Sequence, residues 1–144
     1  MKFEVRSLKE YDGRKFELGS LKLEVLEFDL KSDLPERTFA FAERIVRLCV
    51  YLEGNGRVST TLASQLLRSG TSVGANVEEA GSAESRKDFV HKYAIACKEA
   101  RESHYWLRLL AASEVVPKER LDPLASEANE LIAILTTIIK KSRE

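Results

Sequence analysis

The residues best suited to chemistry gather between positions 98 and 108, where charged and aromatic side chains crowd onto one predicted helix. Glu99 and Glu102 are three residues apart, so the two carboxylates share a helix face and each favours a basic partner. Tyr105 and Trp106 flank the apolar seam of this helix, and exposed aromatic rings beside arginines are typical of protein interfaces. We predict a protein–protein interface here, with two alternatives: a solvated face with weak ion pairs, and a surface on which nucleotides stack.

The sequence offers little evidence for a metal site or a catalytic nucleophile. Asp88 and His91 are three residues apart, the spacing of ferritin-like ligands, but a di-metal centre needs a second such pair on a facing helix. The other histidine, His104, stands alone, and Cys49 and Cys97 have no ligand spacing. We therefore predict no metal, no cofactor and no catalytic residues.

A second group of residues has the charge needed to contact phosphates. Arg37, Arg44 and Arg47 are spaced seven and three residues apart and therefore share a helix face. Together with cations near the C-terminus they would form a basic stripe, which repetition around an oligomer would multiply. The alternative is a solvated face with acidic neighbours. The predicted nucleic-acid contacts are Arg37, Arg44, Arg47, Lys140 and Lys141.

Composition limits the classes of function. The chain has 144 residues, 44% of them hydrophobic, which suits one core. Its 23 basic and 23 acidic residues cancel, so no global charge indicates a nucleic-acid or membrane partner. The N-terminus lacks an apolar signal region, and no apolar run approaches the roughly 18 residues that span a bilayer. We expect a cytoplasmic protein with reduced, structural thiols.

These residues must be positioned by two kinds of element. Residues 1–31 alternate apolar and polar side chains with period two, which predicts a short β-like extension that lies on the rest of the protein or on a neighbouring subunit. From about residue 32 the apolar period becomes helical. The predicted helices begin at Asp33, at about 59–61, at the capping sequence 85–88 and between Pro117 and Pro123.

The four helical segments carry apolar seams spaced alternately three and four residues apart, and short connections make neighbouring helices antiparallel. The sequence therefore predicts an all-α fold: an antiparallel up-down-up-down four-helix bundle over 32–144, preceded by the β-like extension over 1–31.

The stretch "RSGTSVGANVEEA", residues 68–80, is unusual inside a helical pattern. Gly70 and Gly74 are four residues apart, so they would leave a groove in which another helix backbone approaches closely. A phosphate-binding loop is the alternative, but neither glycine-rich phosphate motif is matched. Asn76 falls on the seam, where a hydrogen-bonded amide can set register and partner choice. Glu79 is expected to reach a basic residue of the third helix.

The stretches "QLLRSGTSVGANVEEA" and "DFVHKYAIACKEARESHYWLRLL" resemble the four-helix-bundle family of ribosomal RNA intervening-sequence proteins, and the resemblance runs from about Leu34 to Arg143. It implies a homo-oligomer, typically a ring-like pentamer, and no catalysis. Relatives include the accessory protein of diversity-generating retroelements, which works with a reverse transcriptase and binds nucleic acid. Residues that match the family's motif are Gln65, Arg68, Ser72, Asn76, Glu79, Lys98, Glu99, Glu102, Tyr105 and Trp106.

Our leading functional hypothesis is a non-enzymatic oligomeric helical scaffold that organises a protein or nucleoprotein assembly. The first alternative is a nucleic-acid-binding accessory factor that acts with a reverse transcriptase or ribosomal RNA, and the second is an enzyme or metal-binding bundle. The predicted residues of helix packing and of the oligomer interface are Gln65, Arg68, Gly70, Ser72, Gly74, Asn76, Glu79, Lys98, Glu99, Glu102, Tyr105 and Trp106.

Overall fold

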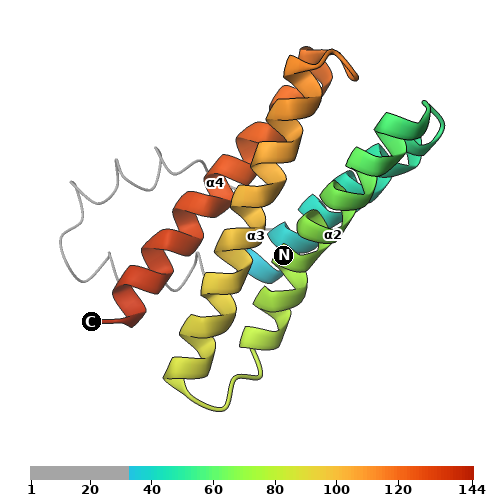
Figure 1. The fold of residues 1–144 in the computed structure, drawn as a ribbon. Coiled ribbons are helices and arrows are strands. Elements are labelled where there is room, and N and C mark those ends of the chain that lie inside the picture. Colours follow the sequence, from blue (N-terminus) through green and yellow to red (C-terminus); the bar gives the residue numbers. More distant parts are fainter. Residues whose placement is uncertain (1–32) are drawn as a thin grey trace, which may run out of the picture.

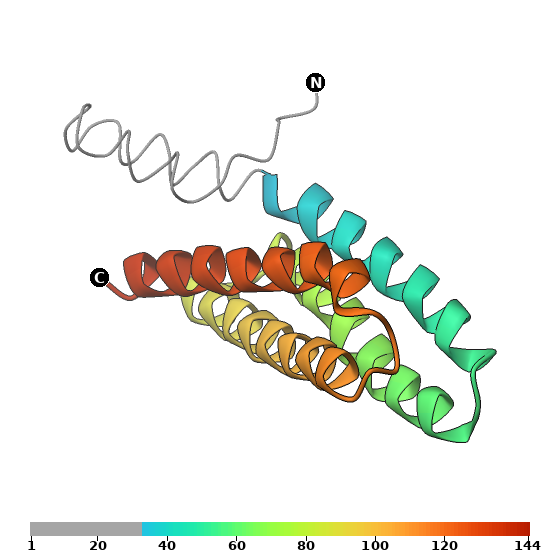
Figure 2. The ribbon, with the colours of Figure 1, turned by 90° about the horizontal axis from the view of Figure 1, so that it is seen from above.

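A computed structural model describes residues 33–144 of the chain. The predicted β-like extension, residues 1–31, lies outside the described residues. The first helix covers residues 33–53 and is followed by α2 (Arg57–Ala80), α3 (Arg86–Ala112) and α4 (Lys118–Ser142). Figures 1 and 2 show these helices side by side, joined by short turns at alternating ends. The predicted antiparallel four-helix bundle is confirmed for this part of the chain, which contains no strand.

The helix ends follow local capping chemistry in part. The hydroxyl of Ser85 accepts a hydrogen bond of 3.0 Å from the backbone N–H of Asp88, so the predicted cap at the start of α3 is confirmed. The fourth helix instead begins at Lys118 and passes through Pro123 without a break. Asp122 therefore lies inside the helix, where its carboxylate pairs with Lys118 at 3.1 Å.

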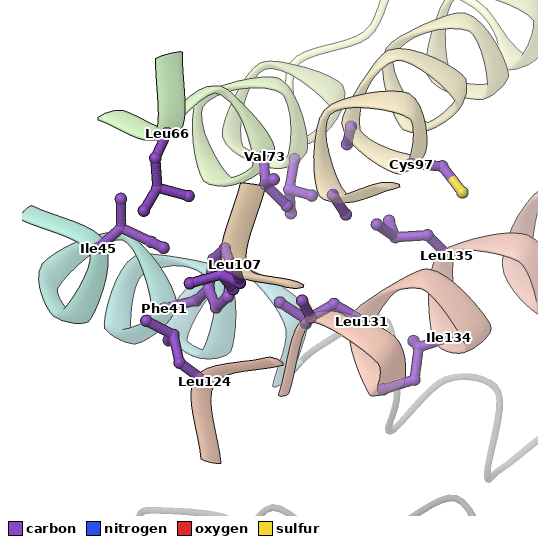
Figure 3. Close-up of a cluster of buried hydrophobic side chains, with 14 of the residues drawn as sticks. Phe41, Ile45, Leu66, Val73, Cys97, Leu107, Leu124, Leu131, Ile134 and Leu135 are labelled. Carbon is purple, nitrogen blue, oxygen red and sulfur yellow. The ribbon is translucent and has the colours of Figure 1, made fainter. Parts of the chain in front are cut away.

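The apolar seams meet in one core between the helices. Figure 3 shows side chains from all four helices converging, among them Phe41, Leu66, Leu107 and Leu131, each no more than 1% exposed. Burial of side chains spaced three and four residues apart is the expected source of stability in such a bundle, because isolated helices of this length are marginal in water.

The helix α2 approaches the first helix closely at Gly70 and Gly74. A Cβ atom on Gly70 would lie 2.7 Å from Cγ2 of Ile45, and one on Gly74 would lie 3.3 Å from the backbone carbonyl of Thr38. The absence of side chains at both positions therefore lets two helices of the same chain pack at short range. This contact offsets the roughly 1 kcal/mol that each helical glycine costs relative to alanine.

Candidate functional site

Most residues predicted for an interface lie together on one surface that α2 and α3 share. Gln65, Arg68, Ser72, Asn76 and Glu79 are spaced three or four residues apart, so they lie on one side of α2, and two of them, Arg68 and Glu79, pair with residues of α3. We call this surface the α2–α3 face. Its residues are Gln65, Arg68, Ser72, Asn76, Glu79, Glu99, Glu102, Tyr105 and Trp106. Lys98, which the sequence analysis grouped with them, instead lines a hollow between α3 and α4.

Arg68 is the centre of the charged contacts on the α2–α3 face. Its guanidinium lies 3.3 Å from a carboxylate oxygen of Glu99 and also pairs with Glu102. The indole Nε1 of Trp106 donates to the same Glu102 carboxylate at 3.1 Å. Because the Arg68 side chain is half exposed, these pairs contribute at most about 1 kcal/mol each. They hold the aromatic side chains in a fixed place on the surface.

Glu79 and Lys92 form a second link between the two helices, at 2.9 Å. The prediction that Glu79 reaches a basic residue of the third helix is thus confirmed. The hydrogen bond and the negative charge of Glu79 raise the pKa of Lys92.

The buried polar contact between α2 and α3 involves residues absent from the predicted site. The hydroxyls of Ser69 and Ser103 are fully buried and lie 2.9 Å apart. Asn76 is only half-buried, and its amide donates to the carbonyl of Ser72 in its own helix at 2.8 Å. Ser69 and Ser103, rather than Asn76, therefore link α2 to α3. The available signal was two serines on otherwise apolar seams.

The remaining residues of the α2–α3 face point to solvent. Gln65 is exposed and makes no hydrogen bond or ion pair with other residues between 33 and 144. The ring of Tyr105 is half exposed and meets Trp106 edge-on, with a centroid distance of 5.1 Å. The face thus combines fixed charges with an accessible aromatic ring.

Arg37 does not belong to an exposed basic stripe. It is buried, and its Nε and Nη2 donate to the two carboxylate oxygens of Glu127 at 2.9 and 2.8 Å, while Nη2 also pairs with Glu130. Burial lowers the pKa of Arg37, but the hydrogen bonds and charges of the two glutamates outweigh it and raise that pKa overall. The prediction of a phosphate contact at Arg37 is wrong, because the guanidinium is already occupied inside the bundle.

The other predicted phosphate contacts separate into different places. Arg44 and Arg47 line a hollow with Arg120, beside the start of α4. Lys140 lines a hollow near the C-terminal end of α4, and Lys141 pairs with the terminal Glu144 at 3.8 Å. The first helix and α4 are antiparallel, so these two groups lie at opposite ends of α4, with the carboxylates around Arg37 between them.

Two adjoining hollows of about 610 and 410 Å³ lie between α3 and α4 and share Ala94 and Arg143. Their floor includes Val90 and Ile139. No carboxylate lines either hollow, and none of the lining cations forms an ion pair with another described residue. We call the surface the α3–α4 groove. Its charged or titratable side chains are Arg86, Lys87, His91, Lys98, Arg101, Lys140 and Arg143.

Large apolar side chains are exposed on the outer side of the first helix. Phe39, Val46 and Val50 are spaced seven and four residues apart and so lie on one helix face, with Phe39 64% and Val50 69% exposed. Leu67 of α2, one turn before Gly70, is also exposed, at 38%. We call these four residues the apolar stripe.

The described residues offer no metal centre. Between 33 and 144 no three His, Cys, Asp or Glu side chains are grouped so that they could hold an ion. Asp88 takes part in the cap of α3, while His91 lines the α3–α4 groove. In the same part of the chain, no helix has the length and apolar character needed to cross a membrane.

The fold and these surfaces define a helical-bundle protein without a recognisable catalytic centre in its described part. The family described as 23S rRNA-intervening sequence protein matches residues 31–137, and the chain belongs to that family. A solved protein of unknown function from the S23 ribosomal protein family of Bacteroides thetaiotaomicron is 40% identical to it. That likeness covers 77% of this chain and 98% of the other, with a TM-score of 0.71. A comparison with curated proteins returned no match.

Proposed function

We propose that this protein is a non-enzymatic helical scaffold whose subunits associate through the apolar stripe and so organise a protein or nucleoprotein assembly. The observation that carries the proposal is the exposure of Phe39, Val46 and Val50 on one face of the first helix, together with the exposure of Leu67 on α2. Single exposed apolar residues are common, but several on one face usually mark an interaction site. Burying a side chain of this kind stabilises an interface by about 1.5–3 kcal/mol.

The family resemblance supports a ring as the form of the assembly. A closed ring with more than two subunits needs a heterologous contact, in which one surface of a subunit meets a different surface of its neighbour. The apolar stripe would be one of these surfaces. The α2–α3 face would be the other, because it presents the half-exposed ring of Tyr105 beside ordered charges.

The stripe is tested with two matched valines. Val50 and Val58 are each 69% exposed, but Val58 lies in the first turn of α2, outside the stripe. Light scattering at a fixed concentration should give a multimer for the wild type and for Val58→Asp, and a smaller species for Val50→Asp. A monomeric wild type, or a Val50→Asp variant with the wild-type mass, would contradict the proposal.

The α2–α3 face is tested in the same way with two tyrosines. Tyr105 and Tyr51 are each 48% exposed, and Tyr51 lies outside both proposed surfaces. Tyr105→Asp should reduce the mass of the assembly, whereas Tyr51→Asp should leave it unchanged. Equal masses for both variants would show that the α2–α3 face takes no part in the assembly. The test of the apolar stripe would be unaffected, because it uses other variants.

The second candidate function is that of a nucleic-acid-binding accessory factor, acting with ribosomal RNA or a reverse transcriptase. The α3–α4 groove favours it, because its cations have no carboxylate partners among the described residues and are free to contact phosphates. The zero net charge of the chain does not oppose this, since binding depends on the local field.

This candidate is tested by titrating labelled single-stranded RNA across a salt series. Replacing Lys98 and Arg101 with glutamate should weaken binding and reduce the salt slope by about 1.4, because each lost phosphate contact removes about 0.7 for a single strand. Arg57→Glu, at an exposed site in the first turn of α2, is the control. Absence of binding at low salt, or an equal loss in the control, would count against this function.

A further inference from the structure

A separate hollow of about 350 Å³ lies between the C-terminal half of the first helix and the start of α4. Its rim carries three arginines and one tyrosine: Arg44, Arg47, Tyr51 and Arg120. Its floor is apolar and is formed by Leu48, Val116, Leu121 and Leu124. A concave apolar floor with a few converging polar groups is the usual form of a small-molecule site.

The three arginines have no strong partner in the described part of the chain. Arg44 forms no ion pair there. Arg47 has only Glu43, at 3.5 Å and with both side chains exposed, and Arg120 lies over the ring of Tyr51 at 6.0 Å. No carboxylate lines the hollow. Three like charges therefore line one hollow, and the only opposite charge paired with any of them in the described part of the chain is the exposed Glu43.

Two features of the surroundings make this arrangement unusual. Arg37 faces the same helix α4, yet it is paired with two glutamates. Arg120 lies in the first turn of α4, where the helix dipole disfavours a cation, and the helix has no side-chain cap. Glu119 in the same turn suits the dipole, but no carboxylate lines the hollow itself to give its arginines compensation, and such a local conflict is expected at a functional site. An anion bound in the hollow would supply that compensation.

The geometry points to a binding site for a phosphate monoester that carries a flat, partly apolar body, such as a nucleoside monophosphate. Guanidinium groups bind phosphate oxygens in pairs of parallel hydrogen bonds, so the rim suits the phosphate. The leucines and the ring of Tyr51 suit the base. The volume lies at the lower end of the range for small-molecule sites, which suits a single nucleotide.

The same chemistry has two sources, a free mononucleotide and the 5′-phosphorylated end of a nucleic acid. Calorimetric titration of the full chain with adenosine monophosphate should give saturable binding, with a dissociation constant of the order of 100 µM. Adenosine should bind at least about tenfold more weakly, because it lacks the charged hydrogen bonds. Inorganic phosphate should also bind more weakly, because it lacks the apolar body. The source is identified by titrating a short oligonucleotide with a 5′-phosphate and the same oligonucleotide with a 5′-hydroxyl. Tighter binding of the 5′-phosphorylated oligonucleotide than of both the 5′-hydroxyl form and the mononucleotide assigns the site to nucleic-acid ends.

Arg44→Ala and Arg120→Ala should each weaken binding of adenosine monophosphate by about tenfold or more. Arg57→Ala is the matched control, because Arg57 is an exposed arginine at the start of α2 and lines none of the three hollows described above. Thermal melting checks that each variant is folded. The inference is overturned if the wild type binds no phosphate monoester at 1 mM, if Arg57→Ala loses as much affinity as the other two, or if adenosine binds as tightly as its monophosphate.

Discussion

Replacing Gly70 with alanine adds a single methyl group at a close contact between the first helix and α2. The new Cβ would lie 2.7 and 2.8 Å from Cγ2 and Cγ1 of Ile45, and 3.1 Å from its Cβ. Ile45 is fully buried, and its β-branched side chain is stiff about χ1, so it cannot move aside cheaply. The added methyl group must therefore push the first helix and α2 apart.

The net effect follows from two opposed contributions. Alanine is favoured over glycine inside a helix by about 1 kcal/mol. Overpacking a core typically costs 1–3 kcal/mol, and two contacts below 3.0 Å with a buried side chain place Gly70→Ala in the upper part of that range. We expect a net destabilisation of about 1–2 kcal/mol. Ile45→Ala alone should lower the free energy of unfolding by about 2–5 kcal/mol. The double variant should be less destabilised than the sum of the two single variants, by about 2 kcal/mol.

The assay is urea unfolding of the four proteins of this double-mutant cycle at one protein concentration. Ala75→Gly, at an exposed position of α2, measures the helix-propensity contribution alone and should destabilise by about 1 kcal/mol. A Gly70→Ala variant at least as stable as the wild type would refute the reasoning. So would a cycle that is additive within about 0.5 kcal/mol.

Three further predictions concern single groups. Arg37→Met should lower the free energy of unfolding by about 3–5 kcal/mol, because it leaves the carboxylate partners of Arg37 without a counter-charge. Arg47→Met, at an exposed pair, should lower it by less than about 1 kcal/mol. Urea unfolding measures both values. Burial, and to a smaller extent the charge of a nearby glutamate, raises the pKa of the Cys49 thiol to about 11. Iodoacetamide at pH 8 should therefore label Cys49 slowly in the native protein and quickly in urea, as measured by peptide mass. Burial and then the charge of Arg108 lower the pKa of His104, so its NMR titration midpoint should lie below the usual 6.5 and rise in Arg108→Ala. Because the folded state binds a proton at His104 less readily than the unfolded state does, this residue should lower the free energy of unfolding as the pH falls through 6.5. A titration midpoint above 6.5 would contradict the prediction.

Local sequence patterns accounted for the helices and their buried seams. The spacing of Phe41, Ile45 and Leu52 is visible in the chain, and all three are buried. The serine cap of α3 was also predicted from the sequence. The start of α4 was predicted only to lie between Pro117 and Pro123, and the structure places it at Lys118. The interval was wide because a proline inside a helix normally marks a boundary, whereas Pro123 is accommodated one turn after the first residues.

The contacts between helices could be predicted only in part. Spacing alone places Arg37, Arg44 and Arg47 on one side of the first helix, but Glu127 on α4 decides that Arg37 is buried and paired. The small residues around Gly70 indicated a close contact without identifying the partner. The pairing of Ser69 with Ser103 depends on how α2 and α3 are rotated relative to each other, which no local spacing contains.

The sequence by itself determined the helical class, the connections and most of the core, because a period of 3.6 residues is a property of neighbouring positions along the chain. Only the tertiary structure decided which surfaces exist outside that core: the apolar stripe, the α2–α3 face, the α3–α4 groove and the hollow lined by Arg44, Arg47 and Arg120. Each of these joins residues of two helices, and two helices share a surface only once packing has set their rotation and register. That choice minimises the free energy of the whole bundle, so no single segment of the sequence can reveal it.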